Sequence, residues 1–180
     1  VNSMQNPKED PALPAAVRQT VWSGVAKTAD RHNKPGVFTA FSGYEWTSMI
    51  SGNNLHRVVV FKDDADKVRQ MIPFSGQDSL DPRDLWQALA NYETATGGEV
   101  LSIAHNGNLS NGMMFPDETV GGSPIDEAYA SLRARFETVY EVTQVKGDGD
   151  CPVYTSDAAD EDDGVTLGRP RATPRKIALH

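Results

Sequence analysis

The run Leu55-His56-Arg57-Val58-Val59-Val60-Phe61 decides which kind of sheet this sequence predicts. Its consecutive valines and the phenylalanine that follows them show no polar alternation, which is typical of a strand covered on both faces. Similar short segments occur at 37–45, 99–105 and 138–145, and they are rich in β-branched or aromatic residues. The sequence therefore predicts four strands.

Helical patterns lie between most of these strands. Apolar residues near helical spacing predict a helix over about 12–32, which a Pro-Gly pair ends. Asp81 and Pro82 provide an N-cap and a first-turn proline for a second helix, and a third is expected over 124–136. Because strands separated by helices usually pair in parallel through right-handed crossovers, we expect an α/β sheet or part of a β/α barrel.

The composition limits the class of protein. The chain has 180 residues and 19.6 kDa, enough for one domain, with 38% hydrophobic residues and a formal net charge of -8. No run approaches the roughly 18 apolar residues of a membrane span. The acidic balance argues against nucleic-acid partners. The single cysteine, Cys151, leaves both a cytoplasmic and a periplasmic location open. Residues 1–11 are expected to form a lead-in loop, and 148–180 an acidic and then Arg/Pro-rich tail.

Three possible metal ligands fall at strand boundaries: Glu45 after the first strand, His56 at the start of the second and His105 after the third. Loops at the carboxyl rim of a parallel sheet converge, and this is where such folds build their sites. Two imidazoles and a carboxylate suit zinc, manganese or iron. The other interpretation is that each histidine is a hydrogen-bonded structural residue, since the spacing matches no local metal motif.

The segment 105–112, His-Asn-Gly-Asn-Leu-Ser-Asn-Gly, could hold a phosphate or carboxylate through its amides and flexible backbone, or could simply form turns. We expect Asn106, Asn108 and Lys146 to contact an anionic substrate, with orientation of the ligand histidines as the alternative role of Asn106 and Asn108. The Asp148-Gly149-Asp150 sequence begins like a calcium loop, but the residues that follow break that pattern.

Taken together, several strings in this sequence resemble the DUF3604 family, which is itself similar to the PHP (polymerase and histidinol phosphatase) metal-dependent phosphoesterases. They cover about 70% of the chain, from about residue 21 to 147, beyond which the resemblance ends. The strings lie at 41–49, 53–57, 81–86, 103–112 and 140–147.

The resemblance implies a distorted seven-stranded β/α barrel with two or three divalent metals (Zn, Mn or Fe) at its rim. Glu45 matches the family's bridging glutamate, and His56 and His105 match the two histidines that follow it. Glu141 and Asn54 are expected to hold these ligands in place. The family's His-x-His motif does not occur before residue 37, and no Asp-x-His follows His105, so we expect an internal piece of a longer protein.

These observations predict a metal-dependent hydrolase, with phosphoester hydrolysis by a metal-bound hydroxide as the reaction. The substrate is expected to be a small anionic ester, and the oligomeric state is left open. Two alternatives stay open: a domain that binds a metal or anion without turnover, and an inactive truncated remnant. An opened barrel would leave strand edges exposed, so the chain alone is expected to be marginally stable and poorly active.

Overall fold

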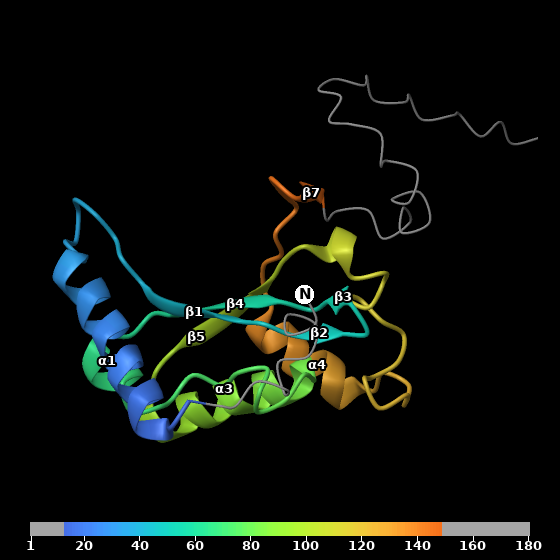
Figure 1. Cartoon of the computed structure of the whole chain (residues 1–180), viewed down its shortest axis with the longest axis horizontal. Helices are drawn as coiled ribbons and strands as arrows, with labels where there is room; N and C mark the ends of the chain where they lie inside the picture. Colours follow the sequence, from blue (N-terminus) through green and yellow to red (C-terminus); the bar gives the residue numbers. More distant parts are fainter. Residues whose placement is uncertain (1–12, 149–180) are drawn as a thin grey trace, which may run out of the picture.

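The computed structural model describes residues 13–148 and combines a small antiparallel sheet with three main helices (Figure 1). The expected lead-in 1–11 and nearly all of the expected tail, from residue 149 on, lie outside the described residues. The elements are α1 (Ala15–His32), β1 (Ser42–Trp46), β2 (Met49–Ile50), β3 (Asn53–Asn54), β4 (Arg57–Phe61), α2 (Ala65–Val68), α3 (Pro82–Thr96), β5 (Val100–Ala104), the 3-10 turn η3 (Gly107–Leu109), α4 (Glu127–Phe136), β6 (Thr143–Gln144) and β7 (Gly147–Asp148).

The predicted helices are confirmed, because their end signals act locally. The Asp81 side chain accepts a hydrogen bond from the backbone N–H of Arg83 at 2.9 Å, and α3 ends at Gly97, whose φ of 63° is left-handed. The Asp126 side chain caps α4 by accepting from the backbone N–H of Tyr129 at 2.7 Å. The first helix, α1, begins at Ala15, slightly later than the predicted start.

The predicted parallel sheet is wrong, and with it the β/α barrel. The strands are ordered β1-β4-β5 and both pairs are antiparallel, with Tyr44 opposite Val59 and Val59 opposite Ser102. Only ten residues join β1 to β4, and they form the β2-β3 hairpin. A parallel pair needs a crossover of a dozen or more residues, usually including a helix, so β4 must return beside β1 in the opposite direction.

The fourth predicted strand, 138–145, does not form either. Tyr140 makes an isolated parallel bridge to Ala104, and the chain then turns into the short β6-β7 hairpin. This segment, drawn in orange in Figure 1, lies beyond the carboxyl end of β5. It therefore adds loop structure at one end of the sheet instead of a full strand.

The two faces of the sheet have different surroundings. Val59 is fully buried, whereas its neighbour Val58 is 37% exposed, so β4 is covered on one face and not on both as its sequence suggested. The hydrophobic core lies on the covered face. Its buried residues are Trp22, Ala26, Trp46, Leu55, Val59, Phe61, Ala65, Val68, Leu85, Trp86, Leu89, Ala90, Tyr92, Val100, Tyr129 and Phe136, and all but Leu55 lie in strands or helices.

A buried ion pair joins the sheet to the helices within this core. Arg57 Nε donates to Glu137 Oε1 at 2.7 Å, and the two side chains are only 1% and 4% exposed. Trp86 Nε1 donates to the same oxygen at 3.0 Å, and Arg133 Nε donates to Oε2 at 3.0 Å. Both carboxylate oxygens are thus satisfied, which is the condition under which a buried charge is tolerated.

Glu137→Gln is expected to lower the free energy of unfolding by about 3–5 kcal/mol, because it leaves the buried Arg57 charge without its counter-charge. Urea unfolding monitored by tryptophan fluorescence measures the change. Glu99→Gln is the matched control, because Glu99 pairs with Lys62 where both side chains are 67% exposed. Equal stability losses in the two variants would contradict a special role for the buried pair.

Candidate functional site

The antiparallel sheet brings the three predicted ligands to one end and one face. Antiparallel order sets the carboxyl end of β1 beside the start of β4, and the start of β4 beside the carboxyl end of β5. His56 and His105 lie directly opposite each other, one residue beyond the Arg57–Ala104 pair, and His105 N–H donates to His56 O at 3.3 Å. Strand alternation then places Glu45, His56 and His105 on the sheet face opposite the core.

Glu45 and His105 are in direct contact. Glu45 Oε1 lies 3.2 Å from His105 Nε2, and the centroids of the His56 and His105 rings are 5.9 Å apart. The His105 side chain is 11% exposed, whereas that of Glu45 is 49% exposed. The cluster is therefore anchored in the protein at the histidine side and open to solvent at the carboxylate side.

His56 is held by backbone and side-chain contacts from the preceding loop. Its Nδ1 accepts from the backbone N–H of Ser48 at 3.1 Å, and its own backbone N–H donates to the buried Asn54 Oδ1 at 2.8 Å. Burial lowers the pKa of His56, and the charges of His105 and Lys146 act in the same direction against the carboxylate of Glu45. His56 is consequently a neutral ring whose proton lies on Nε2.

Asn106, for which we expected contact with substrate or orientation of a ligand histidine, is buried behind His105. It is 2% exposed with a left-handed φ of 57°, and its Nδ2 lies 3.0 Å from His105 Nδ1. Its Oδ1 accepts from Gln144 Nε2, which also donates to Glu141 Oε2 at 2.8 Å. Gln144 and Ser48 were not predicted from the sequence, because no local pattern shows that Ser48 donates to His56 or that Gln144 contacts Asn106, 38 residues away.

Asn108 and Lys146 belong to one loop contact. Asn108 Nδ2 donates to the backbone carbonyl of Lys146 at 2.9 Å, and the Lys146 side chain is exposed. A Cβ built at Gly147, where φ is 124°, would lie 2.6 Å from Asn108 Nδ2. The Asn108 amide therefore packs against the 143–148 hairpin and holds it close to η3. The ammonium group of Lys146 lies near enough to His56 for its charge to lower the pKa of that histidine.

The donor set fits a divalent cation only in part. Two ligands bonded at about 2.0–2.1 Å to one tetrahedral cation lie about 3.3 Å apart, close to the 3.2 Å between Glu45 Oε1 and His105 Nε2. That Nε2 is buried without a well-oriented hydrogen bond among the described residues. Over residues 13–148, however, no three His, Cys, Asp or Glu side chains are grouped to hold a metal ion. Glu45 and His105 are thus two candidate donors in contact with each other, and the His56 ring lies beside them.

Comparison with known proteins identifies the family. The chain matches, over residues 2–164, the family described as "Protein of unknown function (DUF3604)". The chain belongs to the DUF3604 family. No curated protein and no solved structure matches it. The match continues well past Gly147, so the DUF3604 similarity does not end there as we expected.

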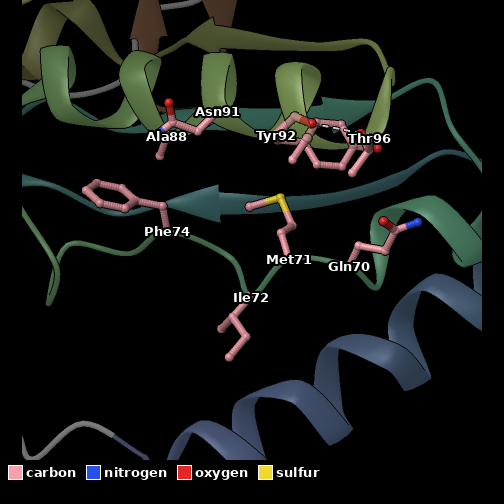
Figure 2. A pocket seen from close by; sticks show the side chains of 9 residues that line it. Gln70, Met71, Ile72, Phe74, Ala88, Asn91, Tyr92 and Thr96 are labelled. Atoms are coloured by element: carbon pink, nitrogen blue, oxygen red, sulfur yellow. Dashed lines mark hydrogen bonds between the residues drawn. The ribbon is translucent and has the colours of Figure 1, made fainter.

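Two other features of this DUF3604 chain lie away from the cluster. Asp30-Arg31-His32 is an Asp-x-His sequence, but Asp30 Oδ2 accepts from the backbone N–H of Ala65 at 2.9 Å and His32 is exposed at the end of α1. An apolar pocket of about 290 Å³ lies between α3 and residues 70–74, and Figure 2 shows its lining. Neither supplies donors to Glu45 or His105. No helix among residues 13–148 is long and apolar enough to cross a membrane.

Lowering the pH below about 6.5, the ordinary histidine pKa, is expected to destabilise the chain through His56. Folding lowers the pKa of His56, so at low pH the unfolded chain binds a proton that the folded chain does not. The free energy of unfolding therefore decreases as the pH is lowered. His56→Asn removes the titrating ring but keeps an acceptor for the Ser48 N–H, so its pH profile should be flatter. Urea unfolding of chelator-treated protein from about pH 5 to about pH 8 measures the difference.

The control for this experiment is His32→Asn, which changes an exposed histidine at the end of α1. It should leave the His56 contribution in place. Identical profiles for wild type and His56→Asn would show that the folded state does not resist protonation of His56.

Proposed function

We propose that this chain carries the metal site of a hydrolase that acts on small anionic phosphate esters, related to the PHP phosphoesterases. The observation that supports the proposal is the 3.2 Å separation of Glu45 Oε1 and His105 Nε2, which suits two ligands of one cation. When bound, a divalent cation such as zinc, manganese or iron activates water as a nucleophile and offsets charge on the phosphoryl oxygens.

The chain's own residues would supply the binding and orientation. Glu45 and His105 would hold the cation on the open sheet face. His56 would be a third donor through Nε2 once its ring proton moved to Nδ1, which requires Nδ1 to give up its hydrogen bond from the Ser48 N–H. His56 is positioned for this by Asn54, whose Oδ1 accepts from the His56 backbone. The exposed Lys146 ammonium would attract the anionic ester, because its charge already acts on His56.

The family resemblance implies two or three cations, and these would need more donors than Glu45, His56 and His105 provide. For the chain as described we therefore propose one cation. The half-exposed Glu45 favours a second candidate function, which is metal binding without turnover, because a water-exposed cation stabilises a transition state less than an enclosed one.

His105→Ala and Glu45→Gln are each expected to lower both bound metal and phosphoester hydrolysis. The affinity loss should exceed the roughly 10–100-fold that follows removal of an outer partner of a ligand. Equilibrium dialysis with Zn²⁺ or Mn²⁺ measures binding, and p-nitrophenyl phosphate and its bis-ester report hydrolysis. Glu45→Gln changes an exposed side chain, so it separates loss of a ligand from loss of folding.

The matched control is His32→Ala, which removes an exposed histidine of α1 and should change neither quantity. Unchanged metal content and turnover in His105→Ala would refute the assignment. Tight metal uptake by the wild type with no hydrolysis of either ester would replace the hydrolase with the binding function.

A further inference from the structure

A continuous chain of hydrogen bonds connects Glu141 to the candidate ligand His105. Gln144 Nε2 donates one hydrogen to Glu141 Oε2 at 2.8 Å and the other to Asn106 Oδ1. Asn106 Nδ2 then lies 3.0 Å from His105 Nδ1. Asn106 is buried, and Glu141 and Gln144 are partly buried, so the chain runs through the protein and not over its surface.

The direction of every bond in this chain is set at the Glu141 end. An ionised carboxylate only accepts hydrogen bonds, so the Gln144 amide must turn its NH₂ group toward Glu141. The same NH₂ group faces Asn106, which must therefore present its Oδ1 there and its Nδ2 to His105. A ring nitrogen that accepts from an N–H donor carries no proton, so the ring proton of His105 lies on Nε2.

We propose that Asn106 and Gln144 are positioning residues. Through them the Glu141 carboxylate sets the donor–acceptor direction of the hydrogen bond to His105, and this direction decides which ring nitrogen of His105 is protonated. In the metal-free chain this directs Nε2–H toward Glu45, 3.2 Å away. Most metal-ligating histidines show the opposite arrangement, in which the other ring N–H is donated to an acceptor. The hydrogen-bonded chain Glu141–Gln144–Asn106–His105, called the relay below, therefore holds His105 in the form that does not bind a cation through Nε2.

Cation binding by His105 consequently requires the relay to reverse. The proton on Nε2 leaves to solvent and a proton is taken up at Nδ1, so the ring remains neutral and no proton is gained overall. Nδ1–H then needs an acceptor, so the Asn106 amide must rotate to present Oδ1. Gln144 must rotate in turn, and its carbonyl oxygen would then face the Glu141 carboxylate, so that two acceptors meet and their hydrogen bond is lost. Glu141 thus opposes cation binding by His105, and this part of the inference rests on the proposed function.

The double variant Glu141→Gln/Gln144→Glu tests the relay, because it exchanges the two groups without changing composition or net charge. In this variant the amide at position 141 donates to the carboxylate at position 144. That carboxylate accepts from Asn106 Nδ2, and Asn106 Oδ1 is left to accept from His105 Nδ1–H. The ¹⁵N NMR spectrum of chelator-treated, histidine-labelled protein reports the result. His105 Nδ1 should be unprotonated in the wild type and protonated in the exchanged variant.

Zinc affinity gives the second measurement on the same proteins. The exchanged variant should bind Zn²⁺ on the order of tenfold more tightly than the wild type, because its relay already favours a free Nε2 lone pair. Glu141→Gln alone, whose amide can donate or accept, should lie between the two. A merely structural role for Gln144 would instead lower the melting temperature and weaken zinc binding in both variants.

The two measurements separate the ways in which the inference can fail. A protonated Nδ1 in the wild type, or an unprotonated Nδ1 in the exchanged variant, would overturn the relay. A reversed Nδ1 with unchanged zinc affinity would overturn the restraint by Glu141. If none of the proteins binds zinc, the proposed function fails, and the NMR result alone decides the relay.

Discussion

The buried ion pair between Arg57 and Glu137 is the interaction on which the arrangement of this structure depends. It connects the first residue of β4, the central strand, to the residue after α4, and Trp86 of α3 donates to the same carboxylate. One charge pair therefore fixes the sheet against two helices. Arg57 follows His56 directly, so strand alternation turns the arginine into the core and the histidine onto the opposite face. The position of the candidate site is thus a consequence of where this ion pair lies.

Strand direction decides whether the candidate ligands meet at all. Glu45 and His105 lie at the carboxyl ends of their strands, whereas His56 precedes the first residue of β4. In a parallel sheet His56 would lie at the opposite edge from the other two. Antiparallel pairing of β4 with both neighbours brings its start to their ends. The predicted fold was wrong, yet the structure that replaces it places these three residues closer together than the predicted sheet would have.

Around this cluster, the polar residues are mostly occupied in holding loops and rings. Asn106 is buried between His105 and Gln144, Asn108 is bonded to a backbone carbonyl, and Asn54 holds the backbone of His56. An Asn- and Gly-rich loop suggests contact with a ligand when only its sequence is known. Here Asn106 and Asn108 make internal hydrogen bonds, and the burial of Asn106 requires partners for its amide. Glu45 and Lys146 are the exposed charged groups of the site.

What the sequence alone determined was local: the helix over most of 12–32, the α3 boundaries at Asp81 and Gly97, the position of the β-branched segments and the three candidate ligands. Caps, glycines and side-chain periodicity act over a few residues, so they are readable without a fold. Tertiary structure decided the direction of the strands, the uncovered face of β4 and the partners of His105. Those outcomes depend on contacts such as Arg57 with Glu137, 80 residues apart, and on connections too short for a crossover. No local pattern encodes them, because they are set by which distant groups share one buried space.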